Sequence, residues 1–154
     1  MPWIDTPRSA DIVGFTSGAW NPFNRGRNNT NQAGAVSELT ISSKQRLDDV
    51  LKYTSNLPFG GTDCAAPMLW ALREKRDYDA FVVLTDNETW AGQIHPHQAL
   101  QQYRQRTGLA SRMIVIGMTA TPFSIANPSD AGSLDVAGFD SAVPTLVSDF
   151  IRGL

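Results

Sequence analysis

Two short stretches of the sequence carry oxygen-bearing side chains of the kind that bind a hard metal ion. The first, GGTDC, places Thr62 and Asp63 directly before an apolar helical period. The second, VVLTDNETW, leads from an apolar run into Asp86 and Glu88. Hydroxyl and carboxylate oxygens suit Mg²⁺, which keeps several waters and takes few protein ligands. The two stretches therefore predict a metal site if the fold brings them to one place.

Each stretch also has a purely structural interpretation. Thr62 or Asp63 stands where a helix N-cap is expected, and capping alone explains one of them. Aspartate is common in turns, which accounts for Asp86 without a ligand. Glu88 could act as a general base beside a metal. A hydrogen bond within its own loop, or to a residue that binds the metal, is the simpler interpretation. A metal-assisted hydrolase using Asp86 and Glu88 is therefore the least favoured function, and we assign no catalytic residue.

The elements that must position these residues alternate along the chain. Near-continuous apolar runs predict strands covered on both faces, as in parallel sheets. Such runs occupy 80–86 and 113–119; a further strand is expected over 10–16, with weaker candidates over 135–139 and 39–41. Helical periods occur over 47–54, 65–72, 96–106 and 143–151. The alternation predicts an α/β fold with a mostly parallel sheet and helices on both faces. In such folds ligands bind beyond the carboxyl ends of the strands, where Asp86 is expected.

Composition excludes several classes of function. The 154 residues are 42% hydrophobic and 18% charged, as in a globular domain, and the net charge of −2 gives no general attraction for nucleic acid or anionic membrane. A single cysteine, Cys64, excludes an internal disulfide and indicates a reducing compartment. No apolar run approaches the roughly 20 residues of a membrane span. We expect a cytoplasmic protein with an N-terminal extension over 1–9 and one domain over 10–154.

Three further features contain residue types that can bind a ligand. The segment Asn21–Gly34 carries Arg25 and Arg27 near aromatic residues, which would suit RNA contacts, although a solvated loop is the simpler interpretation. His95 and His97 lack further partners at zinc-like spacing, so we expect them at the entry to the helix that begins at Pro96. Cys64 has no visible base and is expected to be a packing residue.

Longer stretches carry a resemblance to a known family. GGTDC, FVVLTDNETWAG and SIANPSDAGSLDVAGFD together resemble the C-terminal von Willebrand factor A domain of the Ro (TROVE-family) RNA-binding proteins, from about Ala10 to the C-terminus. The resemblance implies a doubly wound, Rossmann-like fold with a metal-ion-dependent adhesion site. That site takes ligands from a DxSxS motif, a threonine and an aspartate. Thr62 matches the threonine and Asp86 the aspartate, while Asp63 and Glu88 would support the loops.

The sequence departs from the family in one respect. It contains no DxSxS run, and judged against the family it lacks the first, central strand, the first helix and the helical repeats that bind RNA. The resemblance thus implies a partial domain that binds Mg²⁺ or another divalent cation weakly by itself. We expect a non-enzymatic interaction module of a Ro-type noncoding-RNA ribonucleoprotein. Its partner would be a protein supplying the repeats and the DxSxS strand, or a second copy, with RNA bound only indirectly and no membrane. The alternative is direct RNA binding through Arg25 and Arg27.

Overall fold

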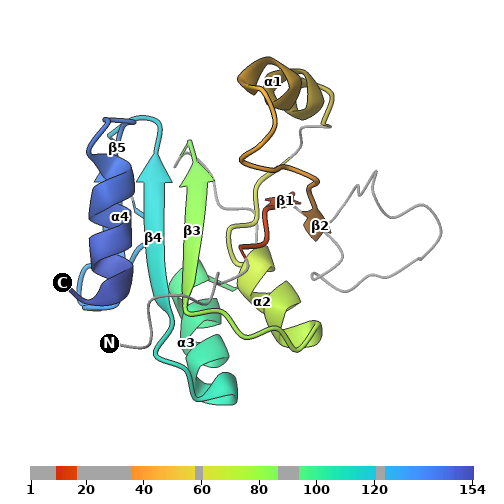
Figure 1. The fold of residues 1–154 in the computed structure, drawn as a ribbon. Helices are drawn as coiled ribbons and strands as arrows, with labels where there is room; N and C mark the ends of the chain where they lie inside the picture. The colour runs from red at the N-terminus through yellow and green to blue at the C-terminus, as the bar shows by residue number, and fades with distance from the viewer. Residues whose placement is uncertain (1–9, 17–35, 58–60, 87–93, 121–123) are drawn as a thin grey trace, which may run out of the picture.

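The computed structural model describes residues 10–16, 36–57, 61–86, 94–120 and 124–154. Within them, strands and helices are mixed along the chain, with β1 and β2, α1 and α2, and β4 and β5 each consecutive (Figure 1). In chain order the elements are β1 Val13–Phe15, β2 Val36–Glu38, α1 Leu47–Ser55, α2 Ala66–Arg73, β3 Ala80–Thr85, α3 Pro96–Thr107, β4 Arg112–Gly117, β5 Ser133–Ala137 and α4 Val143–Arg152.

A three-stranded parallel sheet forms the centre of the fold, in the order β3-β4-β5. Ala80 pairs with Arg112 at one end and Thr85 with Gly117 at the other, so β3 and β4 match over six residues. Met113 to Gly117 then pair with Ser133 to Ala137. The parallel sheet and its place in an α/β fold agree with the sequence prediction. Asp86 follows directly at the carboxyl end of β3.

Two strands form a separate antiparallel pair. Val13 of β1 faces Glu38 of β2, and Phe15 faces Val36. The predicted strand over 39–41 is therefore wrong: the strand lies just before it, at Val36–Glu38. The ladder closes where the Leu39 N–H donates to the Ile12 carbonyl at 2.8 Å. The chain then turns, and the Ser42 N–H donates to the Gln45 side chain, so 39–41 leaves the sheet.

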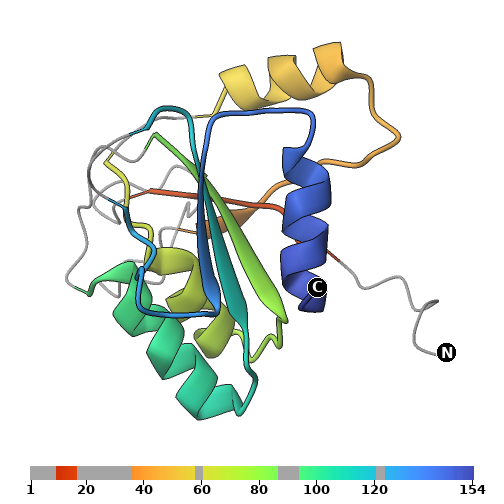
Figure 2. The same cartoon turned by 90° about the vertical axis from the view of Figure 1, so that its left-hand side faces the viewer.

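Helices lie on both faces of the parallel sheet (Figure 2). On one face α2 and α3 bury Met68, Leu100 and Tyr103 together with Phe81 and Val83 of β3. On the other face α4 covers β4 and β5, where Ile114, Ile116 and Val143 form a second cluster with partly buried Leu134 and Val136. Proline occupies an early position of α2, α3 and α4, where a missing N–H costs little.

The face of β3 on the α4 side is uncovered. Val82 and Leu84 are 42% and 60% exposed, whereas their register partners Ile114 and Ile116 are 0% and 6% exposed. The apolar run of β3 predicted a strand covered on both faces, and the described residues cover only one. No described residue pairs with β3 on the side away from β4, and β1–β2 and β3–β4–β5 are separate sheets.

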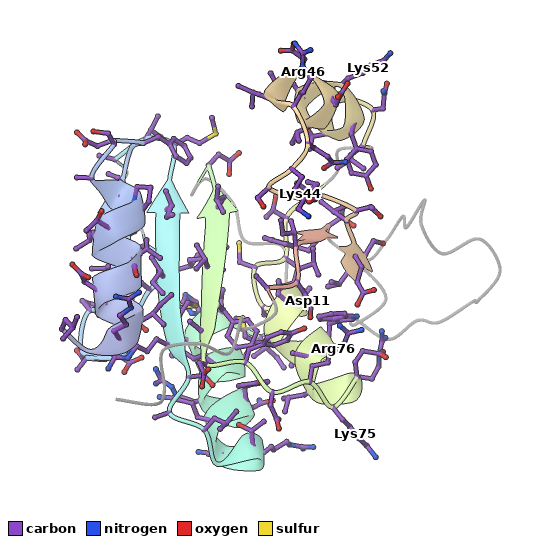
Figure 3. The ribbon with its side chains drawn as sticks, viewed as in Figure 1. Asp11, Lys44, Arg46, Lys52, Lys75 and Arg76 are labelled. Atoms are coloured by element: carbon purple, nitrogen blue, oxygen red, sulfur yellow. The ribbon has the colours of Figure 1, made fainter. Side chains whose placement is uncertain are left out.

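The antiparallel pair is fastened to α2 by Arg76. Its guanidinium forms ion pairs with Asp11 at 3.0 Å and with Glu38 at 2.5 Å, and lies 5.0 Å from the centre of the Trp70 ring. The Tyr78 hydroxyl donates to the same Asp11 carboxylate at 2.5 Å. Figure 3 shows Asp11 and Arg76 close together beside the end of α2. One guanidinium thus holds β1, β2 and α2 in place.

Candidate metal-binding loops

The loop before α2 is held by Asp63. This residue is 6% exposed, and its carboxylate accepts the Ala65 N–H at 3.0 Å. Burial raises the pKa of the Asp63 carboxyl, against the effect of the Ala65 and Ala66 N–H groups. The N-cap position itself is Ala65, without a side-chain cap. The prediction that Thr62 or Asp63 would be the N-cap is therefore wrong in position, although Asp63 does satisfy a backbone donor at this helix start.

Thr62 and Asp86 come from different elements at the carboxyl end of β3. Thr62 is half-buried directly before Asp63, and Asp86 is exposed directly after Thr85. Cys64 links the two loops, because the Thr85 side chain hydrogen-bonds its thiol and both Asp63 and Asp86 act on it electrostatically. Burial, with these two carboxylates, raises the pKa of Cys64 to about 11. Asp63 and Asp86 therefore both lie near one buried thiol.

Two oxygen donors do not make a metal site by themselves. Mg²⁺ prefers an octahedron of oxygens, and Thr62 and Asp86 offer a hydroxyl and a carboxylate of suitable chemistry. The Asp63 carboxylate is engaged by the start of α2. Among the described residues, no three His, Cys, Asp or Glu side chains gather where they could hold a metal ion. The oxygen atoms of Thr62 and Asp86 are therefore of the type that binds a hard cation, but the described residues offer too few of them to complete the coordination.

Three of the predicted residues lie outside the described part of the chain. Glu88 belongs to 87–93, and Arg25 and Arg27 belong to 17–35. The proposed support by Glu88 and the proposed RNA contact by the two arginines are therefore still predictions.

The two histidines enter α3 as expected. His95 is the N-cap of α3, and its side chain and that of Gln98 form a capping box. The Nδ1 atoms of His95 and His97 lie 2.5 Å apart. Burial, with the charge of His97, lowers the pKa of His95. This pair therefore serves the helix start.

The cluster around Arg76 was not anticipated from the sequence. A surface cavity of about 450 Å³ adjoins it, lined by Ser37, Glu38, Trp70, Glu74 and Arg76. Its members lie far apart in the chain: Asp11 and Arg76 are separated by 65 positions. No short sequence pattern predicts such a contact. The sequence shows only that opposite charges occur at distant positions.

Comparison with known proteins decides the family. Residues 27–151 match the model of the Ro60 vWA domain. This chain belongs to that family. It is 52% identical over 115 residues to the RNA-binding protein RO60 of Deinococcus radiodurans, covering 75% of this chain and 22% of the relative. It is 46% identical over 119 residues to the RNA-binding protein RO60 of Caenorhabditis elegans, covering 77% and 18%.

A solved structure of the Ro60 vWA family shares the fold. The crystal structure of the Deinococcus radiodurans RO (RSR) protein matches with a TM-score of 0.69 and 51% identity, covering 77% of this chain and 24% of that one. The von Willebrand factor A-like fold that the sequence predicted is thus confirmed. The chain spans about a fifth of the length of these relatives. Among the described residues, no helix is long and apolar enough to cross a membrane.

Proposed function

We propose that this chain is a non-enzymatic interaction module of a Ro-type ribonucleoprotein, which a partner completes by supplying a strand and further metal ligands. The uncovered β3 carries the proposal. A strand added beside β3 would pair its backbone groups and run toward Asp86, since strands in this sheet are parallel. Its carboxyl end would then stand beside Thr62 and Asp86, where the donor set is short of ligands.

Mg²⁺ would be held by Thr62 and Asp86 together with oxygens of the partner strand. When bound with an open coordination position, the ion would supply an electrophile for an acidic group. The contribution of this chain is to place a hydroxyl and a carboxylate on two loops fixed by the Cys64–Thr85 contact. RNA association would be indirect: the relatives are named RNA-binding proteins, and the chain spans only a fifth of them.

The experiment pairs this chain with the part of the Deinococcus radiodurans relative that lies outside the match. We expect the two to co-purify, and we expect calorimetry to detect Mg²⁺ binding by the pair and little or none by either chain alone. Asp86→Ala should abolish metal binding and leave the complex intact. Asp135→Ala, which removes an exposed carboxylate of β5, is the matched control and should change neither. Failure to co-purify, or tight Mg²⁺ binding by this chain alone, would contradict the proposal.

A further inference from the structure

The two histidines of the chain, His95 and His97, bring their rings together at the start of α3. Their Nδ1 atoms lie 2.5 Å apart, and their ring centres lie 4.3 Å apart. In neutral imidazole the ring nitrogen without a hydrogen carries a lone pair, and two such lone pairs repel each other. A contact this close is therefore stable only with a proton or a metal cation between the two nitrogens.

Helix capping accounts for His95 but not for the ring of His97. The His97 N–H reaches His95 Nδ1 only at 3.4 Å, and the Gln98 side chain accepts the His95 N–H at 3.2 Å. The capping box consists of these two contacts and does not involve the His97 ring. Asparagine, aspartate or serine at position 95 would cap the helix equally well. The approach of the two rings therefore needs an explanation of its own.

The backbone between the two rings is held in one conformation. Pro96 lies between them at the start of α3, where its side chain is fully buried and its own ring fixes φ. Both histidines are half-buried, so their rings rest against the protein and remain open to solvent. Two ligands that already converge lose less conformational entropy on binding than two that must be brought together. The pair is thus arranged in advance for a shared ligand.

We propose that His95 and His97 bind one divalent transition-metal ion of the Zn²⁺ class through their Nδ1 atoms. Imidazole nitrogen is a preferred ligand of Zn²⁺, Ni²⁺ and Cu²⁺. Two nitrogens on one tetrahedral Zn²⁺ ion stand about 3.3 Å apart, so the rings need to separate by less than about 1 Å to admit the ion. Mg²⁺ prefers oxygen ligands. This site therefore differs in chemistry from the candidate loops around Thr62 and Asp86.

The coordination of this ion would be open. In the part of the chain that the structure describes, no third histidine, cysteine, aspartate or glutamate joins the pair. A tetrahedral Zn²⁺ held by two protein ligands keeps two positions for water or for a donor from another molecule. We therefore expect micromolar affinity, weaker than that of a structural zinc site with four protein ligands. The site does not depend on a strand added beside β3, so this proposal and the proposed function can fail separately.

Titration with Zn²⁺ followed by nuclear magnetic resonance tests the site. Because the chain has two histidines, the imidazole signals of the protein without an affinity tag report on this pair alone. At about pH 7.5, where histidine is mostly neutral, Zn²⁺ should shift the signals of both rings along one saturable curve, and excess Mg²⁺ should not. His97→Gln leaves the N-cap in place and should weaken Zn²⁺ binding about tenfold or more. His95→Asn keeps a good N-cap residue and should do the same.

The double variant His97→Gln/Gln105→His is the matched control. It keeps the number of histidines but moves one to an exposed position further along α3, so it should bind Zn²⁺ as weakly as His97→Gln alone. Circular dichroism should be the same for all these chains, and if His95→Asn alters it, the comparison of the other two decides. Ring signals that do not respond to millimolar Zn²⁺ would overturn the proposal and leave a shared proton between the rings. Binding by the double variant as tight as by the unaltered chain would also overturn it.

Discussion

At the scale of single residues, Tyr103 places a hydrogen-bonded hydroxyl in the core. Its fully buried hydroxyl accepts the Tyr78 N–H and donates to the Arg76 carbonyl, both at 2.7 Å. Its ring meets Phe81 edge-on at 4.9 Å between centroids. The hydroxyl thus satisfies two backbone groups at the turn that leads into β3.

Tyr103→Phe should lower the free energy of unfolding by about 1–3 kcal/mol, because it leaves a backbone donor and acceptor without a partner. Urea unfolding followed by circular dichroism measures this. Tyr53→Phe on the exposed side of α1 is the matched control and should change the free energy by less than about 0.5 kcal/mol. An equal effect at the two positions would show that the Tyr103 contacts contribute nothing specific.

His95 makes the free energy of unfolding depend on pH, and the sign of that dependence follows from its pKa. The pKa of His95 is lowered in the folded chain, so the unfolded chain binds the proton more tightly. Stability is then complete above the ordinary histidine pKa of about 6.5 and falls as the pH drops through it. His95→Asn keeps a good N-cap residue and removes the titration.

We expect unfolding curves of the unaltered chain to lose stability between about pH 7 and pH 5.5, and those of His95→Asn to lose less. The lowered pKa of Asp130 affects stability over a lower pH range. Its contribution to the free energy of unfolding is present above the ordinary aspartate pKa of about 4 and is lost as the pH falls below it. Identical profiles for both chains between pH 7 and pH 5.5 would contradict the role given to His95.

At the scale of elements, sequence reasoning succeeded where the signal is local. The apolar runs of β3 and β4 and the periods of all four helices predicted those elements to within two residues, because each pattern reflects burial of one segment. β2 was misplaced because its three residues are selected by pairing with β1, a contact across more than twenty positions. At the candidate site, the metal-ligand roles of Thr62 and Asp86 come from the motif and stay predictions. The Cys64–Thr85 link and the Arg76 cluster were not anticipated, since no short pattern encodes a long-range contact.

Asp130 shows how one side chain joins two elements. Its carboxylate accepts from Arg104 Nη1 at 2.9 Å, from the Ser133 hydroxyl at 2.7 Å and from the Gly132 N–H at 3.0 Å. Arg104 also donates to the Ser111 carbonyl at 2.7 Å. Together these contacts tie α3 to the starts of β4 and β5.

Asp130→Ala should therefore destabilise the fold by about 1–3 kcal/mol, since three donors lose their acceptor. Asp48→Ala removes an almost fully exposed carboxylate, 3.6 Å from Arg46, and should cost less than about 0.5 kcal/mol. Thermal unfolding of both variants gives the comparison. If Asp130→Ala lowers the stability as little as Asp48→Ala does, water replaces the hydrogen bonds of the Asp130 carboxylate without a loss of stability.

At the scale of the whole molecule, β3 has exposed apolar side chains at Val82 and Leu84. β3 lacks a neighbour on one edge and a cover on one face, and α1 lacks a surface to pack against, all within the described residues. The candidate metal ligands lie at the end of that same edge. A single event, the arrival of a strand from another chain, would therefore pair the backbone of β3 and complete the set of oxygen ligands.

RNA binding is a property that we do not expect of this chain alone. Its net charge is −2, and binding to RNA depends on neutralising phosphates with lysine and arginine. Arg76 and Arg104 are already paired with Asp11 and Asp130. We expect no gel shift of a structured noncoding RNA at submicromolar protein and about 0.15 M salt. In low salt, any weak binding should fall when Arg25 and Arg27 are both replaced by alanine, and should not fall for Arg152→Ala at the end of α4. Submicromolar binding at physiological salt would favour the direct RNA-binding alternative and place the RNA site within this chain.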